Sequence, residues 1–170
     1  DADGTTNTIT YSLSSNPGNL FAIGSASGIV TLSSTGSLNY EAATSHDIVV
    51  TATSADTSTS TASYTIGVTD VDEFDVTTPT DGNNATNEID ENASAGTVGV
   101  TASASDADGT TNTVTYSLTN DDSGNFDIDS STGVVSTTGS LNHEAGATRT
   151  IEVTATSADG SSKSETFNIS

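Results

Sequence analysis

Hydrophobic and polar residues alternate in several short segments of this chain. Ile9, Tyr11 and Leu13 occupy every second position, and residues 48–53 and 64–68 show the same alternation. A period of two places successive side chains on opposite faces of a β-strand, and no segment shows a helical period of comparable regularity. The pattern therefore predicts an all-β protein built from short strands.

The sequence also repeats itself at a spacing of about 104 residues. Residues 1–13, DADGTTNTITYSL, recur as DADGTTNTVTYSL at residues 106–118, and TATSAD occurs once in each copy. A unit of this length is too long for a solenoid repeat and matches the size of one β-sandwich domain. We therefore predict two tandem domains, residues 1–74 and residues 75–170.

The two copies are cut at different points. Residues 91–104 precede the repeat in the second copy and have no counterpart in the first, whereas residues 68–76, VTDVDEFDV, close the first copy only. We expect two Greek-key, seven-stranded β-sandwiches, the first lacking its first strand and the second its last linker. Val49 aligns with Glu152, so position 49 is predicted to face water.

The charge balance removes several classes of function. The chain has 23 Asp and Glu against 2 Lys and Arg, which gives a formal net charge of −21 at pH 7. So acidic a chain cannot neutralise a phosphate backbone, which excludes nucleic acid as a partner. No segment approaches the roughly 20 apolar residues of a membrane span, so no membrane insertion is expected. The absence of cysteine excludes disulfides and thiolate metal sites and leaves hard cations as natural partners.

Acidic residues recur outside the predicted strands, at matching places in both copies. Calcium takes about six to eight oxygen ligands, and oxygen donors without His or Cys clusters favour Ca²⁺ over zinc or copper. Acidic residues in turns also serve solubility alone, but the recurrence of one set beside Gly and Asn favours a calcium role. The candidate residues are Asp1, Asp3, Glu41, Asp56, Asp70, Asp72, Glu73, Glu91, Asp106, Asp108, Glu144 and Asp159.

Several motifs are weak singly and specific together. They are Leu-Asn-x-Glu at residues 38–41 and 141–144, Asp-Val-Asp-Glu at 70–73, Glu-Asn at 91–92, Asp-Ala-Asp at 106–108, and FDID followed by STG within 126–133. The pattern covers essentially the whole chain. It resembles the cadherin-like repeats that occur in tandem in large bacterial surface and secreted proteins.

The resemblance implies Ca²⁺ ions at the junction between consecutive domains. Asn39 stands where the family usually has Asp, and Ser157 stands where it has an acid. The glutamate that the first strand of domain 1 should contribute is also missing, so fewer ions than the family norm are expected at the central junction. The ligands implied at the central junction are Asn39, Glu41, Asp70, Asp72, Glu73, Asp106, Asp108, Asn112 and Asp159. Those implied at incomplete outer junctions are Asp1, Asp3 and Asp56 above the first domain, and Glu91 and Glu144 below the second.

No catalytic constellation is evident in the sequence. His46 and His143 occupy unrelated places in the two copies, and both are expected at the surface. The abundant serines lack a matched histidine as base, and a narrow sandwich lacks the cleft that paired carboxylates need for glycoside hydrolysis. We therefore expect no enzymatic activity.

The sequence favours a structural role outside the cell. The leading interpretation is an extender module of an extracellular fibre or giant adhesin, whose acidic linker swings when bare and locks when Ca²⁺ binds. Its partners would be neighbouring repeats of the same chain or of identical chains, with cell-surface carbohydrate or protein bound by domains outside this sequence. A carbohydrate-binding or homophilic adhesion module is a second interpretation, disfavoured by the low aromatic content. A third is a filament subunit that polymerises by donor-strand complementation at the open edge of domain 1.

Overall fold

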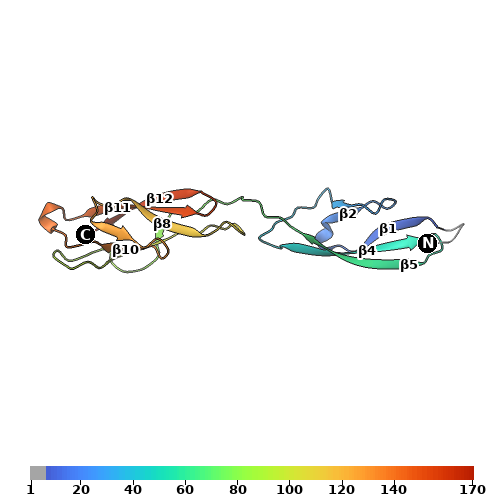
Figure 1. Ribbon diagram of the computed structural model, residues 1–170, viewed down its shortest axis with the longest axis horizontal. Coiled ribbons are helices and arrows are strands. Elements are labelled where there is room, and N and C mark those ends of the chain that lie inside the picture. Colours follow the sequence, from blue (N-terminus) through green and yellow to red (C-terminus); the bar gives the residue numbers. More distant parts are fainter. Residues whose placement is uncertain (1–6) are drawn as a thin grey trace. The chain divides into compact units, whose positions relative to one another are not determined.

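The computed structural model describes residues 7–170, which form antiparallel strands joined by loops (Figure 1). The chain divides into two compact units, Asp1–Val71 (unit 1) and Asp72–Ser170 (unit 2). Apart from two 3₁₀ helices, η1 (Pro17–Asn19) and η2 (His143–Ala145), the described residues contain no helix. Accordingly, nothing in this part of the chain forms a helix with the length and apolar character to cross a membrane. The expected all-β class is confirmed.

Unit 2 is a sandwich of two antiparallel sheets. In the first sheet the strand order is β6 (Thr80–Asp81), β7 (Thr97–Ser103), β10 (Val134–Thr137) and β9 (Phe126–Ile128). The second sheet has the order β12 (Ser162–Ile169), β11 (Arg149–Ser157) and β8 (Val114–Asn120). The seven strands expected for this domain are therefore all present.

The core of unit 2 lies between these sheets and follows the predicted alternation. In β11, Ile151, Val153 and Ala155 are fully buried, whereas the intervening Glu152 and Thr154 are half-buried. Valines and an alanine of β7 and aromatic residues of the neighbouring strands complete the cluster. Burial of these side chains, at about 1.5–3 kcal/mol for each large one, is the main stabilising contribution to a unit without disulfides.

Unit 1 contains the counterparts of only some of these strands. One sheet has the order β1 (Ile9–Ser15), β4 (Ser45–Ser54) and β5 (Thr59–Gly67), and the other pairs β2 (Phe21–Ile23) with β3 (Val30–Leu32). Residues 7–71 contain no counterpart of β6 or β7. The described sandwich of unit 1 is thus short of two strands, where we expected it to lack one.

Two sequence-based expectations for unit 1 were wrong. Val49 is half-buried instead of facing water, because β4 is the central strand of its sheet and Val49 pairs with Ser15 on one side and Ser63 on the other. His46 is also half-buried, with its ring 6.0 Å from the ring of Phe21 in an edge-to-face contact. His143 is exposed, as expected.

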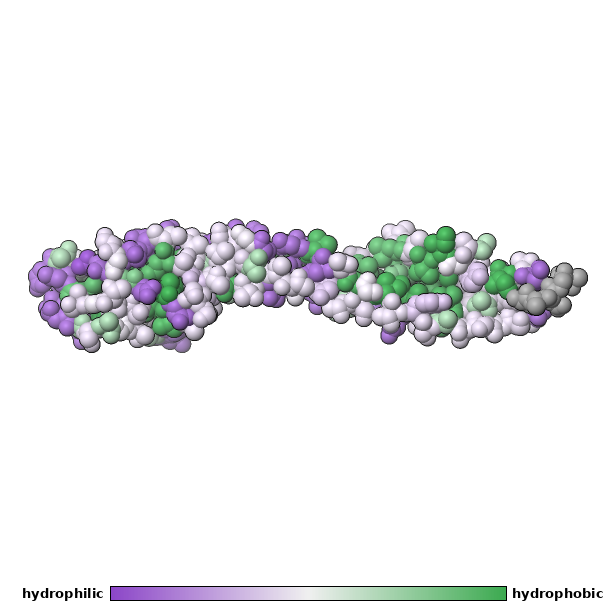
Figure 2. Space-filling view, viewed as in Figure 1, coloured by the Kyte–Doolittle hydropathy of each residue, from purple (hydrophilic) through white to green (hydrophobic). Residues whose placement is uncertain are grey.

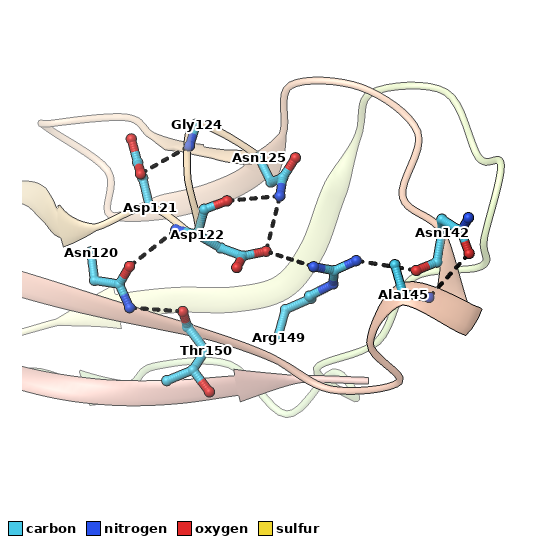
Figure 3. A network of polar contacts seen from close by, with 9 residues as sticks. All are labelled: Asn120, Asp121, Asp122, Gly124, Asn125, Asn142, Ala145, Arg149 and Thr150. Atoms are coloured by element: carbon cyan, nitrogen blue, oxygen red, sulfur yellow. Dashed lines mark hydrogen bonds and ion pairs between the residues drawn. The ribbon is translucent and has the colours of Figure 1, made fainter.

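A single arginine ties together two loops of unit 2 (Figure 3). Arg149 Nη1 lies 3.3 Å from Asp122 Oδ2, and its Nη2 donates a hydrogen bond to the backbone carbonyl of Asn142 at 3.1 Å. Asn125 Nδ2 donates to the carbonyl and carboxylate oxygens of Asp122, at 2.7 and 3.0 Å. The arginine therefore joins the loop that follows β8 to the turn that precedes β11.

Candidate metal centre

The loop between β7 and β8 folds two carboxylates of unit 2 inward. Asp108 is only 2% exposed, and its backbone N–H donates a hydrogen bond to Asp106 Oδ1 at 3.0 Å. Asn112 Nδ2 donates to the backbone carbonyl of Asp108 at 2.6 Å, which holds the loop in a tight curve. These bonds fix the Asp-Ala-Asp motif, in which Asp108 is buried and Asp106 is half-buried.

Two oxygen atoms of this pair lack a hydrogen-bond donor in the part of the chain that the structure describes. Asp106 Oδ2 and Asp108 Oδ1 are buried and accept no hydrogen bond within residues 7–170, although Thr111 Oγ1 donates to Asp108 Oδ2 at 2.9 Å. A buried carboxylate oxygen without a donor is costly unless a cation compensates its charge. The donor set is entirely oxygen, which suits a hard cation such as Ca²⁺.

Two further carboxylates of unit 2 lie close to this loop. A carboxylate oxygen of Glu73 lies within 4.8 Å of one of Asp108. Partial desolvation raises the pKa of Asp72, and negative neighbours raise it further, namely Asp159, Asp108, Asp106 and Asp75. Unit 2 therefore concentrates negative charge at this end, where a bound cation would relieve the repulsion.

The end of β11 supports the loop through a serine. Ser157 is buried, and its hydroxyl donates a hydrogen bond to the backbone carbonyl of Thr111 at 2.8 Å. Asp159, two residues later, accepts a hydrogen bond from the backbone N–H of Ser161 at 2.6 Å. Position 157, where an acid was expected from the family pattern, thus positions the Asp106–Asn112 loop. Sequence reasoning missed this role, and its only signal was the recurrence of serine as Ser54.

Unit 1 carries a smaller acidic pair. A carboxylate oxygen of Glu41 lies within 4.8 Å of one of Asp70, and Asp70 is half-buried. Asn39 Oδ1 accepts a hydrogen bond from the backbone N–H of Ala42 at 2.6 Å and so shapes the turn that presents Glu41. The hydrogen bond described for the Asn39 side chain is this bond within the turn, so the ligand role of Asn39 stays a prediction.

The acids expected at the outer junction below domain 2 lie at the opposite end of unit 2. Glu91 Oε2 accepts a hydrogen bond from the backbone N–H of His143 at 3.4 Å, and Glu144 N–H donates to Asn142 Oδ1 at 2.9 Å. This turn precedes β11 at its first residue, Arg149, whereas Ser157, which bonds to the acidic loop, is the last residue of β11. The eight residue steps between Arg149 and Ser157 span roughly 26 Å along the strand. Glu91 and Glu144 are therefore separate from the Asp106–Asp108 loop.

Of the three acids expected at the outer junction above domain 1, the structure describes Asp56. Asp56 lies in the turn between β4 and β5, where its Oδ1 accepts hydrogen bonds from the Ser58 N–H at 2.9 Å and the Ser58 hydroxyl at 2.6 Å. These bonds lower the pKa of Asp56. Asp1 and Asp3 lie outside the described residues, so their ligand role stays a prediction.

Comparisons with known proteins agree with this architecture. The Cadherin domain family matches residues 1–69 and 86–170. The fold resembles protocadherin gamma B2 extracellular cadherin domains 1–5, with a TM-score of 0.79 and 15% identity over 95% of this chain and 31% of that chain. It also resembles mouse cadherin-23 EC22–24, with a TM-score of 0.74 and 21% identity over 99% of this chain and 55% of that chain. The chain thus spans less than two thirds of these structures, and no curated protein sequence matches it.

Proposed function

Because this chain belongs to the cadherin family and consists of two cadherin domains in tandem, we propose that it is an extender module of an extracellular adhesin. Cadherin domains are extracellular, non-catalytic modules that bind Ca²⁺ at interdomain junctions, and they engage neighbouring repeats and homophilic partners. The extender role refines this general description. The bacterial subgroup suggested by the sequence stays a prediction.

The buried, unpaired oxygens of Asp106 and Asp108 are the observation that carries the proposal. Both residues lie in unit 2, and a carboxylate oxygen of Asp108 lies close to one of Glu73. In the hydrogen bonds described for Asp106 and Asp108, no Lys or Arg side chain donates to their carboxylates, so a cation would meet no positive competitor there. Repulsion within this group favours ion binding over the bare state. Bound Ca²⁺ would supply the positive charge that this group lacks.

Unit 1 would contribute the second half of the site. In the proposal Glu41 and Asp70 act with Asp106, Asp108 and the linker acids, so that ligands from both units share the same ions. The full proposed ligand set is Asn39, Glu41, Asp70, Asp72, Glu73, Asp106, Asp108, Asn112 and Asp159. Domain 1 would then end at residue 74 and domain 2 begin at residue 75, with the linker acids on both sides of the boundary between the two units.

Sharing ligands across a linker would give the metal a mechanical role. Without cation, the like charges repel and the linker samples many conformations; with cation, the ligands of each unit are held at the same ions. The module would then extend an adhesin and keep a distant binding domain away from the cell. Carbohydrate binding and polymerisation stay predictions, since no feature described above favours either.

Calorimetric titration of the 170-residue chain with CaCl₂ tests the ligand assignment. We expect saturable binding that Asp108→Asn weakens at least tenfold, because this change removes one charge from the buried pair. Asp127→Asn is the matched control, since Asp127 is exposed in β9 and its Oδ1 accepts a hydrogen bond that Asn can also accept. Absence of binding at millimolar calcium, or equal affinity of Asp108→Asn, would contradict the proposal, provided that circular dichroism shows both variants folded.

A further inference from the structure

The segment that begins unit 2 is fastened to that unit by groups that are not proposed ligands. Val76 is 1% exposed, and its backbone N–H donates a hydrogen bond to Ser161 Oγ at 2.9 Å. Thr77 and Ser105 form a reciprocal pair. The N–H of Thr77 donates to the Ser105 carbonyl at 2.8 Å, and the N–H of Ser105 donates to Thr77 Oγ1 at 2.9 Å. Since no proposed ligand takes part in these bonds, they hold the segment on unit 2 whether or not a cation is bound.

The fastened segment keeps an acidic side chain close to the Asp106–Asp108 loop. Glu73 precedes the buried Val76 by three residues, and three residues of extended chain span at most about 11 Å. A carboxylate oxygen of Glu73 lies within 4.8 Å of one of Asp108. Figure 2 shows strongly hydrophilic side chains at the surface where unit 2 begins. Unit 2 therefore brings these acids together through contacts of its own.

The loop that carries Asp106 and Asp108 is also held by unit 2 alone. Its hydrogen bonds, at 2.6 to 2.9 Å, come from the side chains of Thr111, Asn112 and Ser157. Asp106 Oδ2 and Asp108 Oδ1 nevertheless accept no hydrogen bond from any of the described residues. The loop is thus ordered in advance while two of its oxygens can still coordinate a cation, which lowers the entropic cost of binding.

Unit 1 offers the cation a poorer set of donors. Its proposed carboxylates are those of Glu41, which is exposed, and Asp70, which is half-buried. In unit 2 the most buried carboxylate, Asp108, is only 2% exposed. The proposed carboxylate ligands of unit 2 number five, namely Asp72, Glu73, Asp106, Asp108 and Asp159. Because calcium affinity rises with the number of charged ligands and with the rigidity of the site, unit 2 should bind more tightly than unit 1.

We propose that the acids of unit 2 bind a first Ca²⁺ ion without help from unit 1, and that Glu41 and Asp70 are recruited with a further ion in a second, weaker step. This inference rests on the proposed function and adds an order of binding to it. The second step restricts the motion of one unit relative to the other, and so it has an entropic cost that the first step lacks. Calcium binding and stiffening therefore have separate thresholds. At intermediate calcium the chain carries an ion and is still flexible.

A CaCl₂ titration of the full ¹⁵N-labelled chain, followed by NMR, tests the order of binding. We expect the amide signals of residues 106–112 to move first and to saturate before those of residues 39–42 respond. The two midpoints should differ at least tenfold in calcium concentration. The tumbling time of the chain, measured by ¹⁵N relaxation, should rise with the second step and not with the first, because the second step joins the units.

Two variants that each remove one negative charge separate the steps. Asp108→Asn should weaken the first step at least tenfold. Glu41→Gln, at an exposed position, should leave the midpoint of the first step unchanged and weaken the second step several-fold. If circular dichroism shows that Asp108→Asn is unfolded, Asp106→Asn at a half-buried position replaces it, with the same expected result.

The titration distinguishes failure of this inference from failure of the proposed function. A single transition, in which Glu41→Gln weakens binding as much as Asp108→Asn does, would overturn the inference and leave the shared calcium site standing. Movement of the signals of residues 39–42 before those of residues 106–112 would overturn it as well. If no signal moved at millimolar calcium, the proposed function and the inference would both be contradicted.

Discussion

The hydroxyl of Ser157 donates a hydrogen bond to the backbone carbonyl of Thr111 at 2.8 Å, from the last residue of β11 to the loop that carries Asp106 and Asp108. The serine is buried, so this bond is shielded from water. It connects the strand framework of unit 2 to the acidic loop. The serine therefore positions the loop and is not expected to be a ligand.

Ser157→Ala should weaken calcium binding as well as stability. Loss of the hydroxyl removes the donor to the part-buried Thr111 carbonyl, at a cost of about 1–2 kcal/mol. It also frees the loop, which should lower Ca²⁺ affinity several-fold. Ser117→Ala, at an exposed position of β8, is the control and should change neither quantity. Urea unfolding and calorimetry measure both effects. An affinity equal to that of the wild type would show that Ser157 has only a structural role.

Gly133→Ala should destabilise unit 2 more than Gly28→Ala destabilises unit 1. Both glycines have positive φ, +71° and +69°, but a Cβ at Gly133 would lie 2.2 Å from the carbonyl oxygen of Ala102, whereas at Gly28 it would meet the Tyr11 ring at 3.3 Å. We expect a loss of about 2–4 kcal/mol for Gly133→Ala and about 1 kcal/mol for Gly28→Ala. Urea unfolding followed by NMR resonances of each unit separates the two. Equal losses would contradict the close approach of β7.

Arg149→Met should loosen the loop network of Figure 3. Arg149 is largely buried and contacts Asp122 and the carbonyl of Asn142, so its loss should cost about 1 kcal/mol. Lys163→Met is the control, because Lys163 makes an exposed 3.7 Å pair with Asp75, and such pairs contribute about 0–1 kcal/mol. Thermal unfolding should show a lower midpoint for Arg149→Met alone. A larger loss for Lys163→Met would be inconsistent with the network.

Asp129 should remain ionised to unusually low pH. Hydrogen bonds from the backbone N–H of Thr132 and from Ser131 lower its pKa from 3.8 to about 2. Because the folded pKa lies below the unfolded value, the stabilisation is fully present above about pH 4 and is lost as pH falls towards 2. A carboxyl ¹³C titration should give a pKa near 2 for Asp129. A midpoint at the ordinary value would show that the turn does not hold its carboxylate.

The sequence predicted the strands and much of the acidic loop correctly, for physical reasons. Two copies of one pattern identify which positions are apolar in both, and Ile151, Val153 and Ala155 are indeed buried. The Asp-Ala-Asp motif, with neighbours that favour turns, predicted a loop that gathers carboxylates. Local patterns of this kind depend on strand period and on turn chemistry, which are properties of short segments.

Contacts between distant segments could not be predicted in this way. The bond from Ser157 to Thr111 joins residues 46 apart in the chain, and the burial of His46 depends on its contact with Phe21. The half-buried state of Val49 depends on strands on both sides of β4. Such features are set by how the strands pair and pack, and a single sequence carries little information on either.

The distribution of distances between the two units, measured with and without calcium, tests the central claim most directly. The chain has no cysteine, so Thr61→Cys in unit 1 and Thr166→Cys in unit 2, both at exposed positions, allow two spin labels to be placed for pulsed electron paramagnetic resonance. The account predicts a broad distribution in chelator, a narrow one in saturating Ca²⁺, and a broad one in both conditions after Asp108→Asn. A distribution of the same width with and without calcium in the otherwise unmodified chain would contradict it.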